Sequence, residues 1–177
     1  MLEFVIALAV VVVALLVLIV NCGNKFRFAS IKIDKAEEDI TLYLERKAEL
    51  LNRTIPIIKK EIKKDDFLED LEDYKNRNYN NFKLHDFLKA SYNELFKVLD
   101  DHEKLMKSES LVKILEDLNE NEENIIGAIK FYNDTVVEFN RLVVSFPSNI
   151  IAFFSRYKKK DFYNNEKREI FEILNTK

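Results

Sequence analysis

An apolar run at the N-terminus constrains the fold more than any other feature. Residues 4–20, FVIALAVVVVALLVLIV, include no polar side chain. At about 1.5 Å per residue, this run together with the first three residues just covers a hydrocarbon core of about 30 Å. No basic segment precedes it and no Ala-x-Ala cleavage site follows it, as a cleaved signal peptide would require. We therefore expect residues 1–22 to form an uncleaved, single-pass transmembrane anchor that contacts membrane lipid through residues 4–20.

The charges that flank this run predict its orientation. Lys25, Arg27, Lys32 and Lys35 follow the run, whereas only the α-amino group and Glu3 precede it. Basic residues near the end of a span favour the cytoplasmic side. The sequence therefore predicts a cell-membrane protein with a cytoplasmic C-terminal body, and the inverted orientation is the alternative.

Cys22 is the single cysteine, so no disulfide can form within the chain. It lies at the predicted membrane boundary, where a lipid could be attached to it. A bacterial lipoprotein would have a small residue just before this cysteine, and here Asn21 precedes it. We expect an unmodified thiol, with lipid attachment at Cys22 as the alternative.

The remaining residues, 23–177, have a composition typical of long helices. The chain has only two Gly and two Pro, 33% of its residues are charged, and it has no Asn-Gly or Asp-Gly turn. Without Glu3, the net charge of −3 becomes −2 for this body, which does not favour a nucleic-acid partner. The prediction is one all-α domain over residues 23–177.

Aromatic residues recur at intervals of seven in the stretch FYNDTVVEFNRLVVSFP, which follows the four-and-three spacing of a coiled-coil seam. Ten of the eleven seam positions are apolar, and they are Leu111, Leu115, Leu118, Glu122, Ile125, Ile129, Tyr132, Val136, Phe139, Val143 and Phe146. The spacing predicts one helix of about 36 residues, about 54 Å long. Asn119, Asn133 and Asn140 lie beside the seam, and we expect their amides to bond to a neighbouring helix.

This helix should stop at Phe146, because the residue before a proline is pushed out of the α region. Ser148 is then a candidate N-cap for one or two further helical turns, SNIIAFFSRY. After it, a charged tail contains one apolar stripe at Ile170, Phe171 and Leu174, which either frays or docks as a short helix.

Apolar residues at helical spacing predict two more long helices, one over residues 28–64 and one over residues 84–106. Pro56 lies inside the first and predicts a kink or a break. Residues 65–71 are expected to form a short helix, and residues 73–81 an irregular link.

The other turn is expected at residues 106–110, with Ser108 or Ser110 capping the next helix. Three long helices with short links predict an antiparallel, coiled-coil-like bundle that runs up, down and up. That order would place Pro147 and the basic cluster Arg156, Lys158, Lys159 and Lys160 tens of ångströms from the lipid.

These residues resemble the LemA family of membrane-anchored bacterial proteins over most of the chain. The similarity is strongest at a pattern of acidic, aromatic-Asn and Phe-Pro positions, here Glu122, Tyr132, Asn133, Phe139, Asn140, Phe146, Pro147, Asn149, Ala152 and Phe162. A weaker match includes Arg46, Lys47, Leu50 and Pro56. Ile129 departs from the family, which commonly has a basic residue there. The resemblance implies an anchor followed by long antiparallel helices and implies no reaction.

Glu122 is the one ionisable residue on the seam, and a buried carboxylate without a partner is costly. Either it pairs with Arg46 or Lys47 and fixes the helix register, or the seam opens there. His85 and His102 are too far apart to share a metal, and His102 is expected to be a satisfied core residue. The sequence identifies no catalytic residue, metal or cofactor, so we do not expect an enzyme.

The sequence therefore favours a LemA-type interaction or scaffold protein with an unidentified protein partner, or one that binds a second copy of itself. One alternative is a structural protein on the outer side of the membrane, inverted or attached to lipid at Cys22. A third is a non-catalytic accessory subunit of a membrane enzyme. The lysine run at residues 158–160 is interpreted as a solvated surface, or else as a site for an acidic partner.

Overall fold

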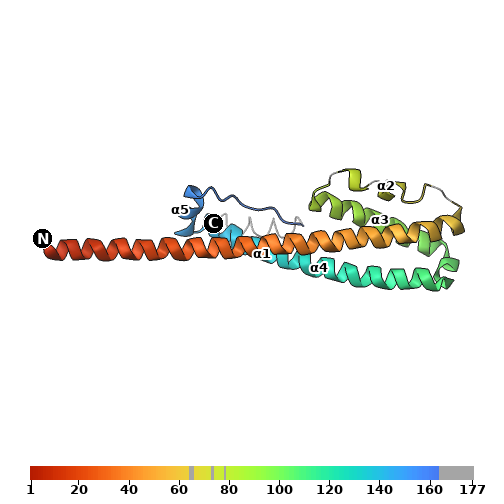
Figure 1. Ribbon diagram of the computed structural model, residues 1–177, viewed down its shortest axis with the longest axis horizontal. Coiled ribbons are helices and arrows are strands. Elements are labelled where there is room, and N and C mark those ends of the chain that lie inside the picture. The colour runs from red at the N-terminus through yellow and green to blue at the C-terminus, as the bar shows by residue number, and fades with distance from the viewer. Residues whose placement is uncertain (64–65, 73, 78, 164–177) are drawn as a thin grey trace. The chain divides into compact units, whose positions relative to one another are not determined.

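Helices are the only regular secondary structure in the described residues, which confirms the all-α class (Figure 1). The computed structural model describes residues 1–63, 66–72, 74–77 and 79–163. Its elements are α1 (Leu2–Ile62), α2 (Glu69–Glu72), the 3-10 helix η1 (Tyr74–Arg77), α3 (Asn81–Asp101), the 3-10 helix η2 (Glu103–Lys107), α4 (Glu109–Val144) and α5 (Ser148–Phe154). The apolar stripe expected at Ile170, Phe171 and Leu174 lies outside the described residues.

The chain forms two compact units, and both α1 and α4 contribute to each of them. One unit, called here the anchor unit, comprises Met1–Ala36 and Lys130–Lys177. The other, called here the bundle unit, comprises Glu37–Ile129. This division differs from the boundary expected at residue 22, which stays a prediction.

Helix α1 is one uninterrupted helix of 61 residues, so the break considered at Pro56 does not occur. Pro56 is exposed, whereas Ile55 and Ile58 on either side of it are buried in the bundle unit. A proline has no N–H to donate to the carbonyl four residues before it. Because Pro56 faces outward, that carbonyl lies on the outer side of the helix, where water can reach it, while the apolar face stays packed.

The N-terminal part of α1 is apolar and bare. By length and composition, α1 is the one helix in the described part of the chain that could by itself cross a membrane, and none of its most apolar stretch is buried. The side chains of residues 4–20 are exposed in the anchor unit. Burial of residues at helical spacing begins at Cys22 and Phe26.

In the bundle unit α3 runs parallel to α1, which corrects the expected up-down-up order. The amide of Asn81, at the start of α3, donates to the Thr41 hydroxyl at 2.7 Å, and Tyr92, further along α3, lies beside Lys47. The segment from residue 63 to residue 80 is long enough to return beside the bundle, because extended chain spans about 3.3 Å per residue. Phe67 and Leu71 in this segment are fully buried.

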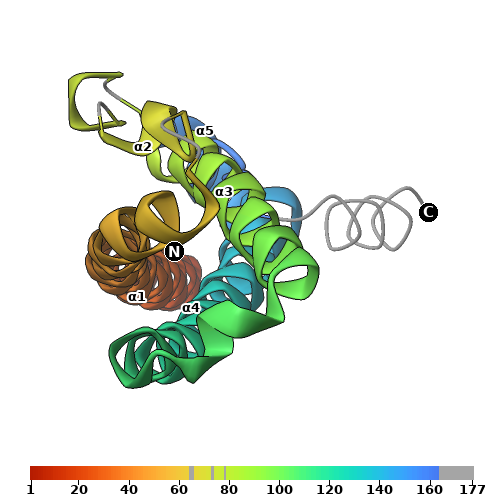
Figure 2. The same ribbon diagram turned by 90° about the vertical axis from the view of Figure 1, so that its right-hand side faces the viewer.

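Helix α4 runs in the opposite direction to α1 and α3, and Figure 2 shows the three helices end-on. Each gives one apolar face to the core of the bundle unit. The core residues are Ile40, Leu44, Leu51, Ile55 and Ile58 of α1, Leu84, Leu88, Leu95 and Leu99 of α3, and Leu111, Leu115, Leu118 and Ile125 of α4. Four of the six predicted seam positions of α4 in this unit are therefore buried, whereas Glu122 and Ile129 are partly exposed.

The turn between α3 and α4 starts earlier than expected. Helix α3 ends at Asp101, and His102 follows as an exposed C-cap whose ring nitrogen lies 3.1 Å from the Val98 carbonyl oxygen, so the prediction of a core histidine was wrong. Met106, expected on the apolar face, is half exposed. Ser108 caps α4, since its hydroxyl accepts from the Leu111 N–H at 3.4 Å.

In the anchor unit α4 packs antiparallel to α1. The Phe139 ring meets the Phe26 ring edge-on at 5.6 Å, and Lys32 and Glu138 form an ion pair at 4.0 Å. The C-terminal end of α4 therefore returns toward the apolar run of α1, and Pro147 does not lie far from it as expected. That expectation followed from the wrong direction given to α3.

Helix α4 ends at Val144, close to the predicted stop. Phe146 lies beyond the helix end and is 80% exposed, so it is not a seam residue. A short helix follows as expected, but Pro147 and not Ser148 is the N-cap of α5, and the Ser148 hydroxyl donates instead to the Ser145 carbonyl at 2.8 Å.

Candidate functional site

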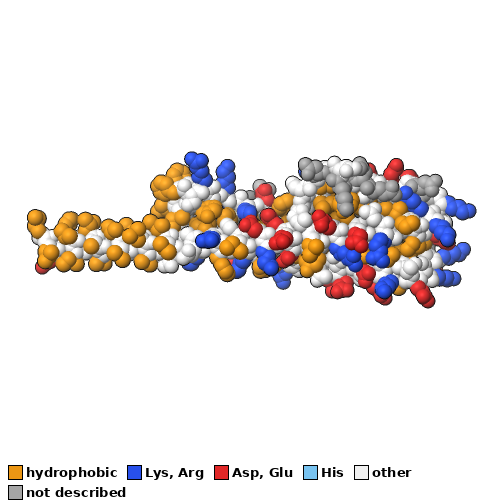
Figure 3. Space-filling model, in the orientation of Figure 1, with side chains coloured by type: hydrophobic (Ala, Val, Ile, Leu, Met, Phe, Trp, Pro, Cys, Tyr) orange, Lys and Arg blue, Asp and Glu red, His pale blue; other side chains and the backbone are white. Residues whose placement is uncertain are grey.

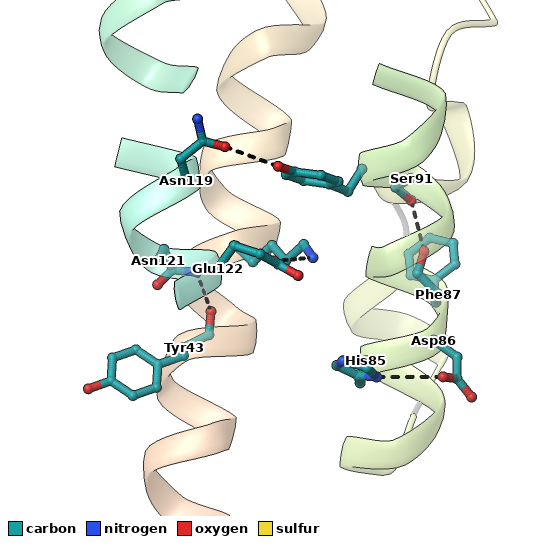
Figure 4. Close-up of polar contacts among 10 residues, drawn as sticks. Tyr43, His85, Asp86, Phe87, Ser91, Asn119, Asn121 and Glu122 are labelled. Atoms are coloured by element: carbon teal, nitrogen blue, oxygen red, sulfur yellow. Dashed lines mark hydrogen bonds and ion pairs between the residues drawn. The ribbon is translucent and has the colours of Figure 1, made fainter. Parts of the chain in front are cut away.

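The bundle unit has a buried ion pair between its helices. The Lys47 ammonium of α1 donates to a Glu122 carboxylate oxygen of α4 at 2.5 Å. The Lys47 side chain is 1% exposed and that of Glu122 is 24% exposed. Figure 4 shows Glu122 directed from α4 into the space between the helices. Of the two basic residues considered as its partner, Lys47 occupies that place and Arg46 pairs with Glu49.

Tyr92 of α3 completes this cluster. The Lys47 nitrogen lies 4.7 Å from the centre of the Tyr92 ring, and the Tyr92 hydroxyl donates to the Asn119 side chain at 3.0 Å (Figure 4). Burial lowers the pKa of Lys47, and its hydrogen bond to Glu122 opposes that shift. Burial and the Glu122 charge raise the pKa of Tyr92.

Two further polar residues lie in the same region. Asn121 of α4 donates to the Tyr43 carbonyl of α1 at 3.0 Å. His85 of α3 is 3.5 Å from Asp86, and burial lowers its pKa despite that carboxylate. A lowered folded-state pKa means that the unfolded chain binds more protons just below pH 6.5, so His85 reduces stability as the pH falls through that range.

The polar contacts of this cluster join α1, α3 and α4 to one another. Its ionisable groups are paired with one another, and the described residues include no group of three or more His, Cys, Asp or Glu side chains that could hold a metal ion. A buried pair between specific positions penalises every other register of α1 against α4. The pairing of Lys47 with Glu122 is confirmed, and its role in fixing the helix register stays a prediction.

In the anchor unit the aromatic-Asn positions of α4 hold the segment that follows α5. Asn140 donates to the Lys160 carbonyl at 2.9 Å and accepts from the Lys160 N–H at 2.8 Å. The Asn133 side chain accepts from the Tyr163 N–H at 3.0 Å, and the Tyr132 hydroxyl donates to the Asp161 carbonyl at 3.1 Å. Of the three amides expected to bond to another helix, Asn119 does so, whereas Asn133 and Asn140 bind extended backbone.

The contacts of residues 157–163 with α1 and α4 are called here the clasp. Aromatic rings also take part in it. The Tyr157 ring stacks on the Phe26 ring at 4.6 Å and meets the Phe139 ring edge-on. The sequence could not reveal Tyr157 as a partner of Phe26, because no periodicity links the two positions.

The anchor unit also has an open groove of about 290 Å³ between α1 and α4. Phe28, Ala29 and Leu142 give it apolar walls, and Lys25, Lys32, Glu138 and Arg141 supply charge at its rim. The Lys32 nitrogen lies 4.8 Å from the centre of the Phe28 ring. Apolar walls with a rim of three basic residues and one acidic residue suit an amphipathic segment with acidic side chains.

The remaining predicted site residues do not converge on a common site. Phe146 is exposed just before α5 and Asn149 is exposed within it, and the Asn149 N–H donates to the Ser145 carbonyl at 2.8 Å. Pro56 lies in the bundle unit, and Cys22 is buried where α1 leaves its apolar run. Whether Cys22 receives a lipid stays a prediction.

Comparison with known proteins agrees with the resemblance noted in the sequence. A model of the LemA family matches residues 36–173, which is most of the chain. No curated protein and no solved structure matches. The matched range includes both the Lys47–Glu122 pair and the clasp residues Tyr132, Asn133 and Asn140.

Proposed function

The chain belongs to the LemA family, and from this premise we propose that it is a single-pass membrane protein whose helical body acts as a scaffold or adaptor at the inner face of the membrane. The body binds proteins and performs no chemistry. Anchoring restricts it to two dimensions, which raises its effective concentration toward partners in or near the same membrane.

The observation that best supports anchoring is the continuity of α1. The single helix α1 contains the bare apolar run of residues 4–20 and also residues that are buried in each of the two units. Each large apolar side chain gains about 1.5–3 kcal/mol on leaving water, and no part of the described structure covers this run. Lipid is the solvent that fits it. The exposed Lys25 and Arg27 just beyond the run favour the cytoplasmic side for the body.

The groove between α1 and α4 supports an interaction role. Phe28 is 63% exposed there, next to a rim with net positive charge. Exposed apolar side chains rimmed by charge are typical of surfaces that bind proteins. We propose an amphipathic helix with acidic flanks as the partner segment, and a second copy of the chain is the alternative occupant.

Photo-crosslinking in native membranes tests this role. With p-benzoylphenylalanine at position 28, we expect a discrete protein adduct, because this side chain forms a wall of the groove. Phe131 is the matched control, since it is an exposed phenylalanine of the same unit that does not line the groove. Adducts of equal yield from both positions, or none from position 28, would contradict the proposal. An adduct of twice the chain mass would identify a second copy.

A further inference from the structure

We propose that α5 is a second membrane contact, a short helix that lies in the headgroup region of the bilayer in which α1 is anchored. The inference rests on the anchoring proposed above and adds a lipid-binding site that the family match does not assign.

Helix α5 lies near the level at which the apolar run of α1 ends. Phe139 of α4 contacts Phe26, and Val144, where α4 ends, is five residues nearer the apolar run. Five residues of helix rise about 7.5 Å, and Phe26 is about 9 Å from Val20, the last residue of the run. Helix α4 therefore ends near the level at which the apolar run ends. Figure 1 shows α5 at the level of this part of α1 along the long axis.

The direction of α5 is that of a helix lying on the membrane surface. The chain bends by 88° between α4 and α5. Because α4 is antiparallel to α1 in the anchor unit, α5 lies nearly perpendicular to the anchor. An anchor that crosses the bilayer thus leaves α5 nearly parallel to the membrane surface, as interfacial helices lie.

The outer face of α5 is apolar. Phe146, Ile150, Phe153 and Phe154 are 80%, 49%, 79% and 79% exposed, whereas Ser148 and Ala152 on the inner face are buried. Figure 3 shows hydrophobic side chains gathered over the apolar run and over α5. An apolar patch of this kind is unusual on a surface that faces water.

The charged residues around α5 are basic. Residues 142–160 include no Asp or Glu, whereas Arg156, Lys158, Lys159 and Lys160 follow α5. Arg156 and Lys158 are exposed, as are Lys25 and Arg27 where α1 leaves the run. Cations beside an apolar interfacial helix attract the phosphates of anionic lipids. This combination fits a lipid surface better than it fits an apolar protein partner.

The clasp explains how so short a helix keeps its orientation. Tyr157, three residues after α5, stacks on Phe26, and the Tyr157 N–H donates to the Ala152 carbonyl at 2.9 Å. The two hydrogen bonds between Asn140 and the Lys160 backbone hold the segment that follows. The segment after α5 is thus attached to the α1–α4 pair, and α4 leads directly into its other end, which keeps the aromatic face of α5 directed outward.

Depth-dependent quenching in nanodiscs that contain anionic phosphatidylglycerol tests the proposal. Single cysteines labelled with an environment-sensitive fluorophore are placed in the full chain on a Cys22→Ala background. Phe153→Cys reports α5, Val12→Cys reports the anchor, and Glu94→Cys on the exposed face of α3 is the control. All three positions are exposed within the structure, so the labels do not disturb its core.

We expect lipids with a shallow doxyl group to cause about a twofold loss of fluorescence at position 153, lipids with a deep doxyl group to cause a similar loss at position 12, and neither to cause much loss at position 94. Loss at position 12 with none at position 153 would overturn the proposal and leave the anchor intact. Loss at 153 without loss at 12 would support the lipid contact and contradict the anchor, and no loss at either would contradict both. A blue-shifted label at position 153 that lipid quenchers do not reach would mean that protein covers α5, which also overturns the proposal.

Discussion

Replacing Phe26 with alanine is expected to lower the free energy of unfolding by about 3–5 kcal/mol. Phe26 is fully buried, and its ring contacts those of Phe139 and Tyr157, which come from two other segments of the chain. The clasp holds Tyr157 and the helix holds Phe139, so neither can fill the cavity easily. Urea unfolding of the full chain in detergent micelles, followed by circular dichroism, measures the loss.

Phe28→Ala is the matched control for this substitution. Phe28 is two residues further along α1 and is 63% exposed, and its contact with Lys32 is a surface contact. Its replacement should change the free energy of unfolding by no more than about 0.5–1 kcal/mol. Equal losses for Phe26→Ala and Phe28→Ala would contradict the packing described for the anchor unit.

The second large effect is expected at Glu122. Glu122→Ala should destabilise the chain by about 3 kcal/mol, because it leaves the Lys47 ammonium buried without its partner. Lys47→Met should cost less, since the Glu122 side chain is 24% exposed and can reach water. The double variant Lys47→Met with Glu122→Leu should lie within about 1 kcal/mol of the parent or be more stable. An unchanged melting temperature for Glu122→Ala would contradict a register role for the pair.

The same pair predicts a pH dependence. Burial lowers the pKa of Lys47 below 10.5 in the folded chain, so the unfolded chain binds more protons just below that pH. Stability should therefore rise with pH in this range. In Glu122→Gln the rise should begin at lower pH, because the partner that opposes the shift is gone, and in Lys47→Met it should disappear. The stability of the three proteins is to be compared below pH 10, because the raised pKa of Tyr92 makes stability fall with pH above that value.

Much of this fold follows from the sequence because burial follows helical periodicity. The four-and-three spacing predicted that Leu118, Ile125, Tyr132 and Phe139 share one face of α4, and all four are buried. It failed at Phe146, because Pro147 ended the helix before that position could face α1. Periodicity describes a face only where the helix persists.

The direction of α3 could not be predicted in the same way. An apolar stripe is the same whether its helix runs up or down, and the length of the connecting segment decides between the two directions. The segment from residue 63 to residue 80 is long enough to return along the bundle, and buried Phe67 and Leu71 attach it there. Counting long helices alone gave the wrong order, and with it the wrong place for Pro147.

The polar contacts were predictable only in part. Glu122 stood out because a carboxylate on an apolar seam needs a cation, and Lys47 supplies it. Asn140 gave no comparable indication, since an amide can bond equally well to a helix or to extended backbone. Its partner, the Lys160 backbone, has no sequence pattern of its own.

Protease protection of a tag placed after Lys177 tests the central claim most directly. In intact cells, we expect the tag to resist added protease until the membrane is permeabilised. After lysis, we expect it to sediment with the membrane fraction. Cleavage without permeabilisation would place the body outside and contradict the orientation inferred from Lys25 and Arg27. A protected tag that leaves the membrane fraction when the cells are lysed would contradict the anchor itself.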